Sequence, residues 1–327
     1  MKLNNIIRAI DIHVAGEPLR FIVDGIPVLR GKTMNDKMNY MKENHDHLRK
    51  SALREPRGFR DIFGGIVTEP VTENADCGVF YLDCGTYYPM CGTGTIGLAV
   101  MLVNTGRVKA IEPVTTVTID TPGGQVSCDV NVKDGHTNSA EYVNVPSFLY
   151  RKAVEVESSS FGKLKVDIGY GGNFVIFIKS EDIGVELNND NKNELIEPAL
   201  EITEKIRKKV KIQHPKQDID YIDSCMYIDE RPGNLLVIGK GQVSRSASGT
   251  GTPARMAREH AYGNLVVGEE FIHTGLIGTK LYGRIIKETK VGDLTATISR
   301  IKSQAFITGF HELFIDQEDP LKEGIFI

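Results

Sequence analysis

The sequence predicts an α+β fold built from two similar halves. Short β-type runs recur along the 327 residues and only a few helical segments lie among them, unlike the regular alternation of a doubly wound sheet. The tetrapeptide Gly-Thr-Gly-Thr occurs twice, at 92–95 and 249–252, and each copy follows β-type sequence and opens a helix. The copies lie almost half the chain apart, so we expect two pseudo-equivalent lobes.

The expected strands are short runs rich in β-branched and aromatic residues. Glycine turns such as Thr121-Pro122-Gly123-Gly124 and Tyr170-Gly171-Gly172 separate several of them. Both halves should therefore contain β-sheet. The predicted strands are Arg20–Val23, Gly65–Val67, Gly78–Leu82, Thr115–Asp120, Val126–Val132, Lys165–Ile168, Phe174–Ile178 and Asn234–Gly239.

Four segments are predicted to be helical. Thr33–Leu53 is long and polar, whereas Thr95–Val103 is apolar almost all round, which indicates a buried helix. Asn191–Val210 is amphipathic, and Pro198 inside it suggests that the regular helix begins there, with the proline in its first turn. Thr252–Tyr262 is the fourth helix.

Composition excludes several classes of protein. Hydrophobic residues make up 41% and charged residues 25%, which is typical of a globular chain rather than a disordered one. The net charge of −4 provides no field for nucleic acid or anionic lipid, so we expect neither as a partner. No apolar run is long enough to span a membrane, and the N-terminus lacks the pattern of a signal peptide. The five cysteines follow neither zinc nor disulfide spacing, which favours a cytoplasmic location and no metal site.

The two repeated turns predict an anion site. A glycine-rich turn that opens a helix presents free backbone N–H groups at the positive end of the helix dipole. Neither copy is followed by the Gly-Lys-Ser/Thr of a P-loop, and neither has the third glycine of a dinucleotide fingerprint. A carboxylate is therefore the expected ligand. The candidate binding residues are Gly92, Thr93 and Gly94 in the first turn and Gly249, Thr250 and Gly251 in the second.

The residue before each turn is the candidate catalytic group. Cys91 precedes the first copy, where the helix N-terminus is expected to lower the pKa of its thiol and make a thiolate available near neutrality. Ser248 precedes the second copy. A thiolate serves as nucleophile or as base, and two groups on opposite faces of a carbon can racemise it without a cofactor. Cys77, Cys84, Cys128 and Cys225 are expected to be buried and inert, since their neighbours alternate like strand residues.

Several segments carry a resemblance to the proline racemase superfamily, and they run through nearly the whole chain. Each segment is similar to a family signature, and the segments that begin at Met90 and Ser244 resemble its two catalytic motifs. The matching segments are Ile10–Arg20 (IDIHVAGEPLR), Glu55–Gly58 (EPRG) with Phe63–Gly65, Met90–Gly97 (MCGTGTIG), Tyr170–Phe174 (YGGNF), Ser244–Thr252 (SRSASGTGT), Ile307–Gly309 and Asp319-Pro320.

The resemblance implies a fold like that of diaminopimelate epimerase, with two pseudo-symmetric lobes and an active site between them. Each lobe is then a curved sheet around a central helix. We expect the first lobe over 1–160, with 308–327 returning to it, and the second over 164–307. Family members act on proline or hydroxyproline without metal or coenzyme, commonly as homodimers, so we expect no cofactor, an amino-acid substrate and a homodimer.

Three positions depart from the family pattern. The racemases carry a second cysteine where this chain has Ser248, a histidine where it has Thr93, and an aspartate where it has Ser244. Because a serine hydroxyl is far less acidic than a thiol, the two-thiol mechanism is not available as written. Asp223 and Arg245 are further candidates for holding the site or the substrate.

The departures leave three functions open. The family includes single-cysteine dehydratases of trans-3-hydroxy-L-proline with threonine at the second catalytic position, and Ser248 is closer to threonine than to cysteine. This favours dehydration with Cys91 as the base. The alternatives are a racemase or epimerase of proline or 4-hydroxyproline, in which Ser248 or water returns the proton, and a non-catalytic amino-acid binder.

Overall fold

The computed structural model describes residues 3–229 and 233–326, and the chain divides into two compact units. Unit 1 contains Met1–Tyr142 together with Ser303–Ile327, and unit 2 contains Val143–Lys302. The C-terminal segment therefore belongs to the same unit as the N-terminal strands. Within the described ranges, no helix is both long and apolar enough to cross a membrane.

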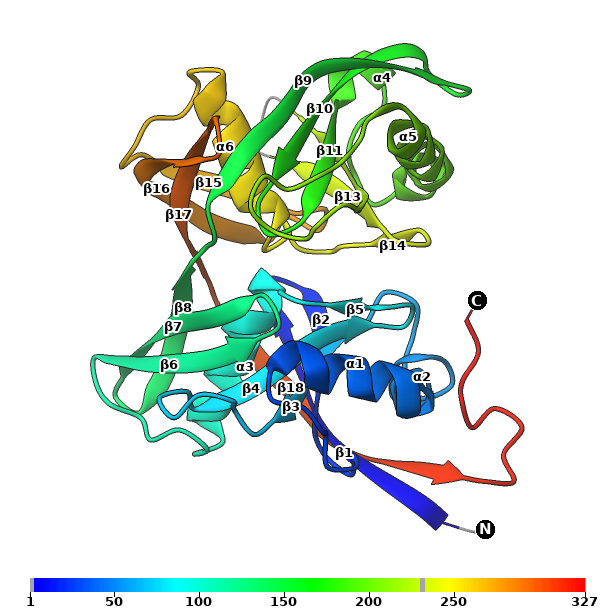
Figure 1. Ribbon diagram of the computed structural model, residues 1–327, viewed down its shortest axis with the longest axis vertical. Coiled ribbons are helices and arrows are strands. Elements are labelled where there is room, and N and C mark those ends of the chain that lie inside the picture. Colours follow the sequence, from blue (N-terminus) through cyan, green and yellow to red (C-terminus); the bar gives the residue numbers. More distant parts are fainter. Residues whose placement is uncertain (1–2, 230–232, 327) are drawn as a thin grey trace. The chain divides into compact units, whose positions relative to one another are not determined.

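Unit 1 is a sheet wrapped around one helix (Figure 1). The strands follow the order β18–β1–β2–β3–β4–β6–β7–β8, with β5 beside β4; β2–β3 and β4–β6 are parallel, and the other pairs given for these strands are antiparallel. The bounds are β1 Leu3–Val14, β2 Glu17–Asp24, β3 Phe63–Thr68, β4 Cys77–Asp83, β5 Tyr87–Tyr88, β6 Val114–Thr121, β7 Gly124–Lys133, β8 His136–Val143 and β18 Ala305–Asp316.

Helices cover both faces of the unit 1 sheet. The central helix α3 (Gly92–Asn104) is buried from Gly92 to Val103 and contacts strands from both ends of the sheet, among them β1, β7 and β18. On the other face lie α1 (Met34–Asn44) and α2 (Asp46–Leu53), which pack with Phe80 and Leu82 of β4 in one apolar cluster. Every residue of β4 is buried as a result.

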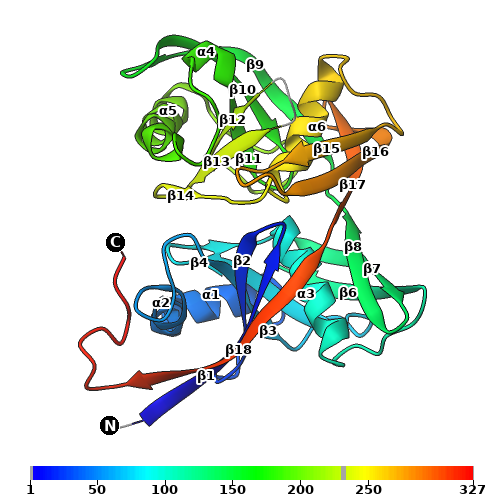
Figure 2. The ribbon, with the colours of Figure 1, turned by 180° about the vertical axis from the view of Figure 1, so that it is seen from behind.

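Unit 2 repeats this arrangement (Figure 2). Its strand order is β15–β16–β17–β9–β10–β11–β12–β13–β14, and β11 pairs with β12 in parallel. The bounds are β9 Ser147–Ser158, β10 Gly162–Tyr170, β11 Phe174–Lys179, β12 Ile222–Ile228, β13 Asn234–Ile238, β14 Gln242–Val243, β15 Glu270–Thr274, β16 Lys280–Val291 and β17 Leu294–Ser303.

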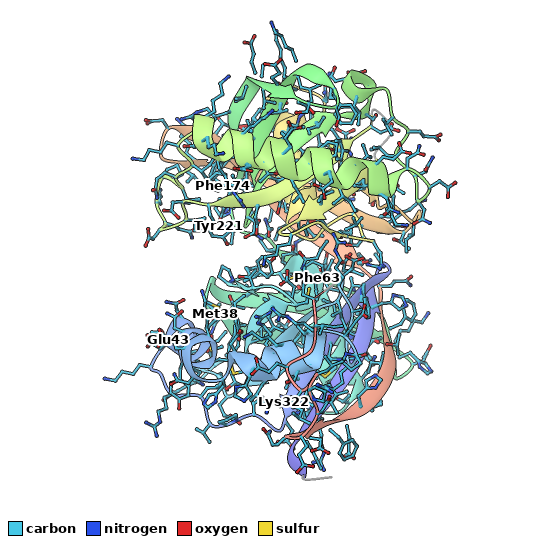
Figure 3. The ribbon with its side chains drawn as sticks, turned by 90° about the vertical axis from the view of Figure 1, so that its right-hand side faces the viewer. Met38, Glu43, Phe63, Phe174, Tyr221 and Lys322 are labelled. Atoms are coloured by element: carbon cyan, nitrogen blue, oxygen red, sulfur yellow. The ribbon has the colours of Figure 1, made fainter. Side chains whose placement is uncertain are left out.

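The helices of unit 2 again lie on opposite faces of the sheet. The central helix α6 (Gly251–Ala261) contacts β9, β10, β11 and β16, whereas α5 (Ile196–Lys209) packs against β9, β12 and β13 and faces the viewer in Figure 3. Phe174, labelled in Figure 3, belongs to the same core cluster as Ile202 and Ile206 of α5. A four-residue helix α4 (Ser180–Ile183) follows β11, and a 3₁₀ turn (Lys192–Leu195) leads into α5.

The predicted α+β class, with a sheet around a central helix in each lobe, is confirmed. Each of the eight predicted strands lies in a strand of the structure, except that β13 ends at Ile238, one residue before the predicted end. The prediction of one helix over Thr33–Leu53 is wrong, because the chain leaves helical geometry at His45 (φ −138°) and starts again at Asp46. Pro198 does lie in the first turn of α5.

Candidate functional site

The first repeated turn places Cys91 at the N-terminus of α3. Cys91 is the N-cap residue in extended conformation (φ −145°, ψ 117°), and Gly94 N–H points at its sulfur with an N to Sγ distance of 3.4 Å. The Thr93 hydroxyl oxygen lies 3.5 Å from the same sulfur. Both groups are able to donate to a thiolate, and the N-terminus of α3 is suited to an anion such as a carboxylate.

Packing fixes the first turn from its buried side. The Thr95 hydroxyl donates to the Cys91 carbonyl oxygen at 2.9 Å and receives the Tyr81 phenol from β4, with 2.9 Å between the two oxygens. A Cβ at Gly94 would lie 2.5 Å from the Tyr81 ring, so only glycine allows this approach. Tyr81 and Thr95 were not identified from sequence, although Thr95 is the fourth residue of the repeated tetrapeptide.

The electrostatics of Cys91 differ from the sequence-based expectation. Burial is the largest influence and raises the pKa of the Cys91 thiol above its ordinary value of 9.0, although Thr93 and Gly94 N–H act to lower it. The nearby carboxylate of Glu17, a buried residue at the start of β2, raises the pKa further. The expected thiolate near neutrality is therefore wrong for this structure, since desolvation outweighs the helix N-terminus.

This arrangement predicts the pH dependence of Cys91 alkylation. The iodoacetamide reaction should rise with pH to a midpoint above pH 9, because the thiolate reacts and the pKa of its thiol is raised. Glu17→Gln should move the midpoint down, since it removes a negative charge that opposes the thiolate. Mass spectrometry at Cys91 measures the rate, and Glu43→Gln on the exposed surface of α1 is the control. A wild-type midpoint below pH 8 would contradict the structure.

The other four cysteines are buried, as expected. Burial raises the pKa of Cys77 to about 12 and that of Cys84 to about 11, and it also raises the pKa values of Cys128 and Cys225. All five cysteines lie in the described residues, and Cys91 alone among them is partly exposed. It is therefore the cysteine best placed for chemistry.

The second repeated turn has a different backbone geometry. Ser248 lies in the left-handed region with φ +70°, and its hydroxyl oxygen accepts Gly251 N–H at 2.9 Å. Helix α6 begins at Gly251 with Thr250 as the N-cap residue, so Gly249 and Thr250 precede the helix, whereas Gly92 already belongs to α3. Ser248 is 7% exposed.

Three glycines allow the chain to close around the second turn. A Cβ at Gly171 would lie 2.3 Å from the Thr250 carbonyl oxygen, and a Cβ at Gly275 would lie 2.6 Å from the Arg245 carbonyl oxygen. A Cβ at Gly251 would lie 2.9 Å from the Ser248 hydroxyl. The Tyr170–Phe174 signature thus has a structural reason, because its glycine allows the β10–β11 turn to contact the start of α6.

The remaining candidates lie in the same unit as Ser248. The Ser244 hydroxyl is 3.3 Å from that of Ser246, which in turn accepts Ser248 N–H at 3.2 Å, so Ser244 is linked to the second turn. Asp223 lies near the start of β12, where its carboxylate accepts the Ser224 hydroxyl at 3.1 Å. The Arg245 guanidinium donates to the Val243 carbonyl at 3.4 Å.

Two further signatures hold unit 1 together. Arg20 makes a two-point ion pair with Asp11, both N to O distances being 2.8 Å, and also donates to the carbonyls of Ala52 and Arg57. Arg57 in turn donates to the carbonyl of Lys322 and contacts Asp319 in the C-terminal segment. These arginines of the first two signatures therefore stabilise the fold.

Comparison with known proteins extends these observations to the whole chain. The sequence profile of the family described as proline racemase matches residues 9–326. A proline racemase from Clostridioides difficile is 42% identical over 334 residues and covers 100% of both chains. A trans-3-hydroxy-L-proline dehydratase from Burkholderia ambifaria is 33% identical over 334 residues, with 100% of both chains covered.

A solved structure gives the same result. The hydroxyproline epimerase from Agrobacterium vitis, with bound trans-4-hydroxy-L-proline, matches with a TM-score of 0.92 at 25% identity, covering 100% of this chain and 97% of that chain. These relatives are a racemase, an epimerase and a dehydratase, which are isomerase and lyase activities. The profile match spans both repeated turns and nearly every element described above, and this chain belongs to the proline racemase family of enzymes.

Proposed function

We propose that this enzyme dehydrates trans-3-hydroxy-L-proline, with Cys91 as the base that removes the Cα proton. Gly92, Thr93 and Gly94 are proposed to bind the substrate carboxylate through the N-terminus of α3. A relative that is 33% identical over the whole chain is a dehydratase for this substrate, which supports the proposal.

One observation carries the proposal: only one of the two equivalent turns is preceded by a cysteine. Cys91 caps α3, whereas Ser248 occupies the corresponding position before Gly249-Thr250-Gly251-Thr252. A serine hydroxyl is a poor base at neutral pH, because its pKa lies far above that of a thiol. A reaction that needs one base fits this pair better than one that needs two. Gly249, Thr250 and Gly251 are proposed as the second binding turn, with Ser244 and Asp223 as supporting groups.

The proposed step balances with a single base. The Cys91 thiolate takes the Cα proton, and the electron pair of the Cα–H bond forms the Cα–Cβ double bond. The Cβ–O bond breaks, and the departing hydroxide takes the proton from the Cys91 thiol, which lies on the same face of the ring, so that water leaves and the thiolate is regenerated. The remaining enamine acid tautomerises to a cyclic imine in solution. The raised pKa of the Cys91 thiol makes the thiolate scarce at neutral pH but a stronger base.

A racemase or epimerase remains the second candidate. It is favoured by the 42% identity to a proline racemase, which is higher than the identity to the dehydratase. In that reaction Ser248 or a water molecule returns a proton to the opposite face of Cα. A binder without catalysis is the third candidate, because three site positions differ from the family pattern. The cytoplasmic location and the homodimer stay predictions.

Proton NMR in D₂O with trans-3-hydroxy-L-proline, trans-4-hydroxy-L-proline and L-proline separates these candidates. The proposal predicts loss of the Cα proton together with formation of the imine from the 3-hydroxy substrate alone. Deuterium at Cα with inversion and no loss of water would establish the epimerase instead. No change in any of the three substrates would favour the third candidate, binding without catalysis. Equilibrium titration with the same three amino acids would then measure that binding.

A further inference from the structure

We infer that Thr252 and His273 are positioning residues, which hold the Ser248 turn through a buried hydrogen-bond network. This inference rests on the proposed function to the extent that the second turn takes part in the reaction. The network lies entirely in unit 2 and contains four buried residues, namely Thr252, His273, Asn234 and Arg255.

The Thr252 hydroxyl is in contact with both carbonyls of the strained turn. Its oxygen lies 2.7 Å from the Ser248 carbonyl oxygen and 3.0 Å from that of Ala247. The Asn234 amide also donates to the Ala247 carbonyl at 3.0 Å. Because Ser248 has φ +70°, a conformation that non-glycine residues rarely adopt, surrounding contacts must hold it there.

The hydrogen-bond partners determine which ring nitrogen of His273 carries the proton. Nε2 faces two groups that only donate, the Asn234 amide nitrogen at 2.8 Å and the Arg255 guanidinium at 3.1 Å. Nε2 is therefore the acceptor, and Nδ1–H donates to the Thr252 hydroxyl at 2.9 Å. The hydroxyl hydrogen of Thr252 is then available to donate to the carbonyls of Ser248 and Ala247.

Burial fixes the direction of the hydrogen bond from His273 to Thr252. His273 is fully buried, and desolvation together with the Arg255 charge lowers its pKa well below the ordinary value. The ring therefore stays neutral and keeps Nε2 as an acceptor. Arg255 is held in turn by the carbonyls of Gly233 and Asp229, at 2.8 and 2.7 Å.

Unit 1 contains an equivalent hydrogen-bond arrangement with a different donor residue. There the equivalent threonine, Thr95, donates to the Cys91 carbonyl and receives the Tyr81 phenol. Tyr81 and His273 come from different strands, β4 and β15, yet each supplies one donor to the fourth residue of Gly-Thr-Gly-Thr. Because the threonine makes this contact in both copies, the contact is a feature of the repeated turn and not of the local packing in one unit.

The test compares substitutions that remove or keep a donor. Thr252→Val and His273→Leu should lower kcat per folded enzyme roughly tenfold, because small displacements of a reacting turn reduce rates strongly. Thr252→Ser and His273→Asn keep a donor near the same place and should retain kcat within about twofold. Thr203→Val is the matched control, since Thr203 is also buried and donates to its i−4 carbonyl, in α5.

The outcomes separate a positioning role from a structural one. If Thr252→Val and Thr203→Val lower the melting temperature equally and leave kcat unchanged, the inference is wrong while the proposed function stands. If the wild-type enzyme converts none of the three substrates, the proposed function fails, and NMR then decides the inference.

Side-chain ¹⁵N spectra should show that His273 carries its proton on Nδ1. Backbone amide spectra should show shifted resonances of Ser248 and Gly249 in Thr252→Val but not in Thr203→Val. Protonation at Nε2, or unmoved amides, would overturn it.

Discussion

Cys91→Ala is expected to reduce turnover of trans-3-hydroxy-L-proline by roughly 10²–10⁴-fold, the usual contribution of a positioned general base. The thiol is held at the N-terminus of α3 by Gly94 N–H and by the backbone contact from Thr95, so alanine removes the base and leaves the turn. Steady-state kinetics on the purified variant measure the loss.

Cys225→Ala is the control for this variant. Cys225 is fully buried in β12 of unit 2, so its replacement is expected to lower stability while the turnover of the folded enzyme is unchanged. Retention of more than a tenth of the wild-type kcat by Cys91→Ala would show that the base lies elsewhere. The buried carboxylate of Glu17, which acts on the pKa of Cys91, would then be the next residue to replace.

Arg20→Leu is expected to cost about 3–5 kcal/mol of unfolding free energy, since it leaves a partly buried carboxylate without its main partner. The Arg20 side chain is 7% exposed and that of Asp11 is 18% exposed, and the substitution also removes two hydrogen bonds to backbone carbonyls. Urea denaturation followed by circular dichroism measures the change in the free energy of unfolding.

Arg8→Leu provides a matched control on the neighbouring strand β1. Arg8 also bridges two carboxylates, Asp24 and Glu312, but its side chain is 59% exposed and those of its partners are 64% and 54% exposed. Exposed ion pairs contribute about 0–1 kcal/mol, so this variant should remain close to wild type. Equal losses for Arg8→Leu and Arg20→Leu would contradict the structural role assigned to the first signature.

A continuously buried strand such as β4 was readily predicted from the sequence, whereas two long strands with many exposed positions were not. Every residue of β4 is buried, since α1 and α2 pack against it and Tyr81 contacts Thr95 of α3, and its sequence is a continuous apolar run up to Leu82. Strands β16 and β18 were not predicted, because exposed residues such as Lys287 and Glu312 interrupt their apolar positions. Their assignment depends on pairing with distant strands, which a local pattern does not contain.

The break between α1 and α2 also depends on distant contacts. Neither glycine nor proline marks it, and His45 ends α1 without such a signal. Asp46 then accepts the Arg49 guanidinium at 2.7 Å and the Tyr87 phenol, from β5, at 2.9 Å. The contact with Tyr87 is long-range, so no pattern within Thr33–Leu53 reveals it, whereas the Asp46–Arg49 pair is local to α2.

The candidate site was predictable as far as the repeat extends. Gly-Thr-Gly-Thr located both turns, and Cys91 and Ser248 followed from their positions before it. The partners of the two threonines, Tyr81 and His273, were not predictable, because different strands deliver them to equivalent places. The direction of the Cys91 pKa shift was also missed, since the degree of burial appears only in the folded chain.

The most direct test of the single-base reaction is the configuration of substrate recovered after partial conversion in D₂O. Wild-type enzyme is incubated with trans-3-hydroxy-L-proline, and the remaining amino acid is analysed by chiral chromatography and mass spectrometry. With Cys91 as the only base at Cα, the recovered substrate keeps the L configuration while imine accumulates. Recovery of deuterated cis-3-hydroxy-D-proline, the Cα epimer, would contradict the account, because it requires a second acid on the opposite face.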